Sequence, residues 1–117
     1  GRMKAGPGLF VAQVVGESMN RLIPNGAWCL WRAGPVALPE GKVVLAQHRG
    51  IADAETGGMF TVKRFGSERR VGEDGLVEKV RVTLAPRSRD PGFEAIVVEE
   101  TDGDEVAVLA ELVGVLR

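Results

Sequence analysis

The chain has 117 residues, of which 44% are hydrophobic, and its 15 basic and 16 acidic side chains give a formal net charge of −1. This length predicts one domain with a sizeable core, and the near-neutral charge excludes the strongly basic surface typical of nucleic-acid binding. A single cysteine, Cys29, excludes an internal disulfide and a cysteine-based zinc cluster, and no apolar stretch approaches the roughly 20 residues that cross a bilayer, so we expect a cytoplasmic protein.

Short runs rich in valine recur along the chain and are separated by Gly, Pro, Asn and Asp. This pattern is typical of an all-β or mostly-β domain, because β-branched side chains suit a half-buried pleated sheet. We expect a flexible N-terminal segment over residues 1–8 and one domain over residues 9–117. Its strands are expected at 9–15, 27–32, 42–47, 60–65, 77–84, 94–99 and 106–116.

Turn signals lie between these expected strands. Residues 18–23 are the one plausible helical turn, and residues 48–58 read as a long polar hairpin loop. Tight turns are predicted where Gly follows Pro, Asn, Asp or Glu, because Gly tolerates a positive φ. These turns are expected at 24–26, 38–42, 73–75, 90–92 and 101–105.

Ser18 directly follows the first expected strand, and its role has two interpretations. Its side-chain oxygen could cap the helical turn. Alternatively, Ser18 could be a nucleophile, but a serine hydroxyl is a weak nucleophile and needs a base to take its proton. His48, the single histidine, lies at a strand end, and no Gly-x-Ser-x-Gly sequence surrounds Ser18, so we expect a loop histidine rather than part of a triad.

Lys63 is the stronger candidate for the base. It lies in the strand-like sequence Thr-Val-Lys-Arg-Phe at 61–65. Alternate side chains of a strand share a face, so we expect Lys63 to lie on one face with Thr61 and Phe65. A buried lysine that gives up its proton is a competent general base. An exposed lysine that lies along the sheet is the alternative.

Several segments together resemble a known family. They are Gly-Glu-Ser-Met at 16–19, a Pro-Asn-Gly turn followed by a strand, Thr-Val-Lys-Arg-Phe at 61–65, Ser-Arg-Asp-Pro-Gly-Phe at 88–93, and a closing Gly-Val strand. In this order they resemble the C-terminal peptidase domain of the LexA, UmuD and lambda-type repressors, which are self-cleaving relatives of bacterial signal peptidases. The resemblance covers residues 11–116, nearly the whole chain.

The resemblance implies a role for each residue of the Gly-Glu-Ser-Met sequence and for the lysine. Ser18 would be the nucleophile and Lys63 the general base. The backbone N–H groups of Glu17 and Ser18 would form the oxyanion hole, which needs a fixed backbone rather than a particular side chain. Gly16 would allow a sharp bend before the serine, and Met19 would pack beneath the dyad and keep Lys63 dry.

The resemblance also implies a fold and partners. The fold would be mostly β, with several curled antiparallel sheets and one short helical turn after the serine. The substrate would be a peptide bond in the same chain or an associated chain, and no metal or organic cofactor would be needed. Homodimerisation would involve the C-terminal strand at 106–116, as an edge strand with unpaired backbone groups. In the repressors, activated RecA filament triggers cleavage, and the domain could belong to a repressor or to a larger bacterial or phage protein.

The sequence departs from the family pattern at three places. The family cleaves a small-residue bond well upstream of its serine, whereas Ala5-Gly6 lies only 12 residues before Ser18 (18 − 6). The loop at 48–58 replaces a tight turn, and Asp90 and Phe93 replace the Asn and Tyr of the family. The short upstream segment keeps an alternative in view, in which the domain is catalytically silent and serves as a dimerisation or protein-interaction module.

Overall fold

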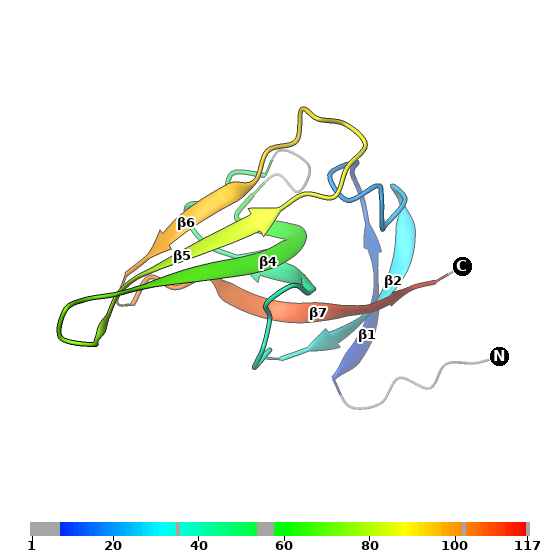
Figure 1. The fold of residues 1–117 in the computed structure, drawn as a ribbon. Coiled ribbons are helices and arrows are strands. Elements are labelled where there is room, and N and C mark those ends of the chain that lie inside the picture. Colours follow the sequence, from blue (N-terminus) through cyan, green and yellow to red (C-terminus); the bar gives the residue numbers. More distant parts are fainter. Residues whose placement is uncertain (1–7, 35, 54–57, 102, 117) are drawn as a thin grey trace.

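The strands predicted from the valine-rich runs are all present in the structure, a computed structural model that describes residues 8–34, 36–53, 58–101 and 103–116. The fold is all-β, so the mostly-β prediction is confirmed (Figure 1). The described residues contain no helix long and apolar enough to span a membrane. The strands are β1 (Leu9–Val14), β2 (Ala27–Ala33), β3 (Val43–Gln47), β4 (Phe60–Val71), β5 (Val77–Ala85), β6 (Ile96–Glu100) and β7 (Ala107–Val115).

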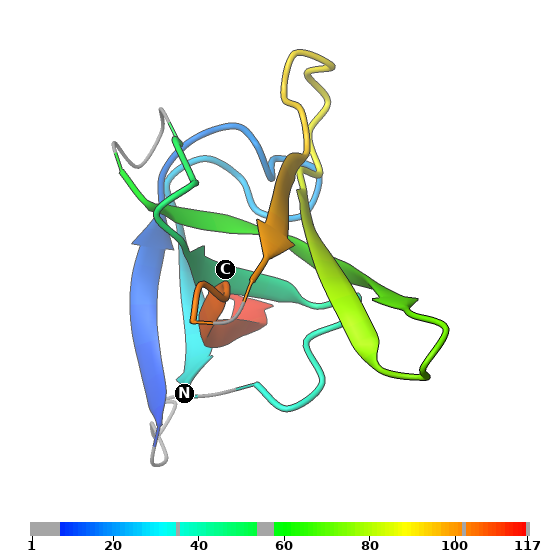
Figure 2. The ribbon, with the colours of Figure 1, turned by 90° about the vertical axis from the view of Figure 1, so that its left-hand side faces the viewer.

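The seven strands form one antiparallel sheet in the order β1-β2-β7-β3-β4-β5-β6, not the several curled sheets expected (Figures 1 and 2). The reason is the position of β7, which pairs with β2 on one side and with β3 on the other. The expectation that the C-terminal strand is an edge strand is therefore wrong, because β1 and β6 are the edges. Only residues 107–111 of β7 pair with β3, however. Within the described part of the chain, residues 112–115 therefore have a neighbouring strand, β2, on one side only.

The predicted turns are present among the described residues. The glycines of four of them, Gly26, Gly41, Gly75 and Gly103, have φ values of 77° to 82°, the left-handed region that glycine tolerates. The turn at 90–92 is closed by a hydrogen bond from the Phe93 N–H to the Asp90 carbonyl oxygen.

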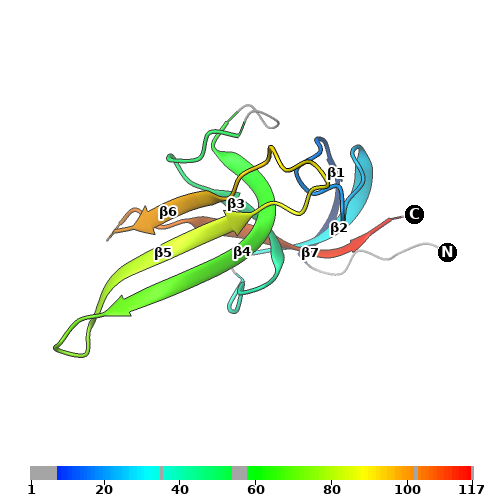
Figure 3. The same ribbon diagram turned by 45° about the horizontal axis from the view of Figure 1, so that its top comes forward.

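Strand β4 is longer than the predicted 60–65, because it continues through Gly66 and the charged residues after it to Val71. Strands β4 and β5 form a long hairpin that extends beyond the other strands (Figure 3). Arg81 of this hairpin lies between two opposite charges: Glu68 is its cross-strand neighbour on β4, and its Nε lies 2.8 Å from Glu99 Oε1 on β6. Such cross-strand pairs favour continued pairing.

The core consists of two clusters, and β3 contributes to both. Val44 and Ala46 are fully buried in one cluster, whereas Val43 and Leu45 pack against the other. This division follows from the alternation of side chains along a strand. The second cluster contains Cys29, whose burial raises the pKa of its thiol. A buried thiol is the usual state of a free cysteine in an apolar run such as 27–31.

Glu111 of β7 makes two ion pairs that give the stability of the sheet a pH dependence. Lys42 Nζ and Arg32 Nη1 each lie 3.2 Å from a Glu111 carboxylate oxygen. The hydrogen bond from Lys42, followed by that from Arg32, holds the pKa of Glu111 below its ordinary value, against the opposing effect of burial. A carboxyl group whose pKa is lowered by folding stabilises the protein above its unfolded-state pKa, and this stabilisation is lost as the pH falls through the folded-state pKa.

Glu111→Gln should therefore lower the free energy of unfolding at neutral pH, by at most about 1 kcal/mol because both cations are partly exposed. The difference from the wild type should shrink as the pH falls below about 4.3. Urea unfolding at several pH values measures this. A difference that does not depend on pH would show that the ion pairs are not its source.

Candidate active site

The connection between β1 and β2 presents Ser18. Gly16, two residues earlier, has a φ of +117°, which residues with a side chain rarely adopt. Its N–H donates a hydrogen bond of 2.8 Å to Asn25 Oδ1, which closes the connection across its ends. The prediction that Gly16 permits an unusual backbone bend before the serine agrees with this φ value.

The segment between β5 and β6 holds the serine turn in place. The Arg87 N–H donates to the Ser18 carbonyl oxygen, and the Arg21 N–H donates to the Arg87 carbonyl oxygen, each at 2.9 Å. The Arg89 N–H also donates to Asn20 Oδ1 at 2.8 Å. In Figure 1 this segment, in yellow, lies beside the blue connection that carries Ser18.

These contacts explain why the predicted helical turn at 18–23 is not a helix. In a helix, the Ser18 carbonyl would accept from the N–H of Leu22, and Arg21 would donate to residue 17. Both groups bond to Arg87 instead. What remains are three hydrogen bonds within the turn, one from the Asn20 N–H to the Glu17 carbonyl oxygen and two from the Leu22 and Ile23 N–H groups to the Met19 carbonyl oxygen.

Lys63 is buried on β4. Thr61, Lys63 and Phe65 have exposed fractions of 0%, 4% and 9%, whereas Arg64 between them is exposed. The prediction that these three side chains share one face is confirmed, and the alternative of an exposed lysine is wrong.

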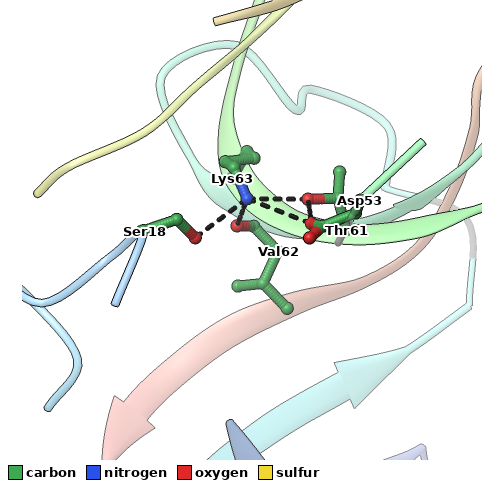
Figure 4. A network of polar contacts seen from close by, with 5 residues as sticks. All are labelled: Ser18, Asp53, Thr61, Val62 and Lys63. Atoms are coloured by element: carbon green, nitrogen blue, oxygen red, sulfur yellow. Dashed lines mark hydrogen bonds and ion pairs between the residues drawn. The ribbon is translucent and has the colours of Figure 1, made fainter. Parts of the chain in front are cut away.

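Figure 4 shows the polar contacts of the Lys63 amine. Nζ lies 2.9 Å from Ser18 Oγ, 2.7 Å from Thr61 Oγ1, 3.1 Å from the Val62 carbonyl oxygen and 3.4 Å from Asp53 Oδ2. Ser18 is itself only 7% exposed. Two residues that lie 45 positions apart in the chain thus meet inside the protein, at hydrogen-bond distance.

Asp53 is a member of this cluster that sequence reasoning missed. Its side chain is 8% exposed, and Oδ2 accepts a hydrogen bond from the Thr61 hydroxyl. An isolated bridge between Asp53 and Gly58 joins the ends of the loop. No motif pointed to Asp53, because the loop reads as generally polar and the contact depends on how it folds against β4.

The hydrogen-bond network suits a base that accepts the serine proton. A neutral lysine amine has two N–H groups and one lone pair. The Thr61 hydroxyl donates its hydrogen to Asp53, so its oxygen can accept one N–H from Lys63. The Val62 carbonyl oxygen can accept the second N–H. The lone pair is then directed to Ser18 Oγ, the remaining close neighbour at 2.9 Å.

His48 has other partners. Its Nδ1 accepts the Gly50 N–H at 2.8 Å, and its Nε2 lies 3.1 Å from Asp104 Oδ1, at an angle too poor for a hydrogen bond. His48 is at the end of β3, as expected, but it is buried rather than exposed. The contacts described for it fit a structural histidine.

The remaining predicted site residues lie around the serine. Met19 is 2% exposed and belongs to the core cluster against which Val62 packs, whereas Lys63 points to the other face of β4. The role of Met19 in excluding water from Lys63 stays a prediction. The backbone N–H groups of Glu17 and Ser18 also keep their oxyanion-hole role as a prediction. Ala5-Gly6 lies outside the described residues.

Comparison with protein families and with curated sequences adds no relative. The chain matches no protein-family model and no curated protein sequence. Interpretation of the site therefore depends on its own geometry and on the motifs of the sequence.

Proposed function

We propose that the chain is a serine endopeptidase domain of the LexA type, in which Ser18 is the nucleophile and Lys63 the general base. The observation that supports this proposal best is the contact of 2.9 Å between Lys63 Nζ and Ser18 Oγ in a buried site. If Ser18 only capped a helical turn, it would not need this contact with Lys63. In addition, no helix begins at Ser18 among the described residues.

The reaction would proceed through an acyl-enzyme. Lys63 Nζ takes the hydroxyl proton of Ser18 while Oγ attacks the carbonyl carbon of the peptide bond, and donors at the oxyanion position stabilise the negative charge. The C–N bond breaks, and the leaving amine takes the proton from Lys63. Water then hydrolyses the ester, with Lys63 again as base, and restores the Ser18 hydroxyl.

The substrate and partners follow from the family resemblance and are part of the proposal. The cleaved bond would lie in the same chain or in an associated chain, within a repressor or a larger bacterial or phage protein. RecA filament would be the trigger. A homodimer would use residues 112–115 of β7, which are described with a neighbouring strand on one side only. We also propose that the strands are arranged as in the LexA family.

Cleavage should accelerate when the pH rises, because a lysine acts as a base only after losing its proton. The test uses the full natural protein, with any residues that precede Gly1, incubated at about pH 7 and at about pH 10. Intact mass measured over time identifies the fragments and the cleaved bond. Fragment formation at equal rates at both pH values would contradict a lysine base, and an absence of fragments with and without RecA filament would contradict self-cleavage.

The second candidate is a protein-interaction module with a silent dyad. It is favoured by the low exposure of Ser18, at 7%, and by the ion pair that Lys63 makes with Asp53. In this case the protein would form no fragments at either pH value, with or without RecA filament. It would still dimerise or bind a partner protein.

A further inference from the structure

We propose that Asp53 is a positioning residue that sets the pH range in which Lys63 can act as a base. This inference rests on the proposed function and extends it to a residue that no motif indicates. Two described contacts of the Asp53 side chain carry the argument: Oδ2 lies 3.4 Å from Lys63 Nζ and accepts a hydrogen bond from the Thr61 hydroxyl. Each contact has a separate consequence for the reaction.

The first consequence is electrostatic and restrains the reaction. Asp53 and Lys63 have side chains that are 8% and 5% exposed, so water screens their attraction poorly. A carboxylate at this distance attracts an ammonium group much more strongly than a neutral amine. Among the described contacts of Nζ, Asp53 provides the only charge. The charged residues of the serine turn and of the segment that holds it are exposed: Glu17, Arg21, Arg87 and Arg89.

The second consequence is geometric and supports the reaction. Because the Thr61 hydroxyl hydrogen is bonded to Asp53, the Thr61 oxygen can accept a hydrogen from Lys63 at 2.7 Å. This bond helps to fix the orientation of the amine, so that its lone pair is directed to Ser18. Asp53 therefore keeps the amine in place while it opposes the loss of the amine proton.

Two substitutions separate these effects. Asparagine at position 53 removes the charge but keeps a carbonyl oxygen that can accept from Thr61. Asp53→Asn should therefore lower the pH of half-maximal cleavage by at least about one unit, which makes cleavage near pH 7 about tenfold faster, and leave the rate at high pH nearly unchanged. Asp53→Ala removes both the charge and the acceptor, so it should also lower the rate at high pH.

The experiment measures the rate of fragment formation in the full chain from about pH 6 to about pH 11, a range that spans the ordinary titration of lysine. Asp104→Asn is the matched control, because it changes the net charge equally and its described contacts are with His48 and Arg49. Its profile should coincide with that of the wild type. An Asp53→Asn profile with an unchanged midpoint would overturn the proposal, whatever happens to the maximal rate.

A direct titration tests the proposal even if the chain cleaves nothing. In a Ser18→Ala background, the 13Cε signal of Lys63 is followed by NMR as the pH is raised, and Lys63→Met assigns this signal among the four lysines. The midpoint should be lower when Asp53→Asn is added. In the protein with Asp53 intact, the NMR signal of the Asp53 carboxyl carbon should also shift, at the same pH as the Lys63 signal. This measurement needs no substitution in the ion pair. Independent titrations would overturn the coupling, whereas coupled titrations without cleavage would contradict only the peptidase function.

Discussion

Ser18→Ala should produce a folded protein that forms no fragments under any condition in which the wild type cleaves. Loss of the nucleophile of a serine peptidase lowers the rate by about 10⁴- to 10⁶-fold, because no other group forms the acyl-enzyme. The fold should survive, because the hydroxyl lost is only one of the polar neighbours of Lys63 Nζ. The expected cost in stability is about 1 kcal/mol.

Intact mass over time at about pH 10 measures the loss of cleavage, and urea unfolding shows that the variant is folded. Ser18→Cys is a useful companion, because a thiol is also a nucleophile and changes the size of the side chain little. Fragments that form from Ser18→Ala at the wild-type rate would show that Ser18 is not the nucleophile, or that another protease is present. If the Ser18→Ala variant fails to cleave because it is misfolded, its urea unfolding curve will differ from that of the wild type.

Lys63→Ala should destabilise the fold strongly, by about 3–5 kcal/mol, independently of any catalytic role. The substitution leaves the Asp53 carboxylate buried without its cation, and such an unpaired buried charge is costly. Domains of this kind have a total stability of about 5–15 kcal/mol, so the loss is a large fraction of it. Urea unfolding at neutral pH measures the difference from the wild type.

The double variant Lys63→Ala, Asp53→Asn provides the control, because it removes both charges. It should recover a clear part of the lost stability, and the difference between the single and double variants reports the coupling between the two side chains. Equal stabilities for the single and double variants would show that Asp53 carries no buried charge. An inactive Lys63→Ala variant is therefore weaker support for the dyad than an inactive Ser18→Ala variant.

The strands could be predicted from the sequence because their signals are local. Valine-rich runs and glycine turns identify all seven strands, and the alternation around Lys63 correctly places Thr61 and Phe65 on its face. The position of β7 depends on pairing with distant strands, so no local pattern indicated that it lies between β2 and β3. The helical turn at 18–23 was wrong for the same reason, because Arg87 is remote in the sequence.

The candidate site was predictable only in part. Ser18 and Lys63 stand in recognisable motifs, and the structure brings these two side chains together. Asp53 could not be predicted, because a single aspartate in a polar loop has no distinguishing neighbour. The contact of the buried His48 with Asp104 was missed in the same way, since Asp104 belongs to the connection after β6.

The position of β7 has a consequence for the growing chain on the ribosome. Ser18 lies on the connection of the β1–β2 hairpin, and Lys63 lies on β4, and in the sheet these two parts are joined through β7 and β3. Of the seven strands, β7 is the last to be synthesised. A nascent chain without Ala107–Val115 therefore has two separate sheet fragments, one with the serine and the other with the lysine. Sheet pairing connects the two halves of the dyad only when the final strand has been added between them.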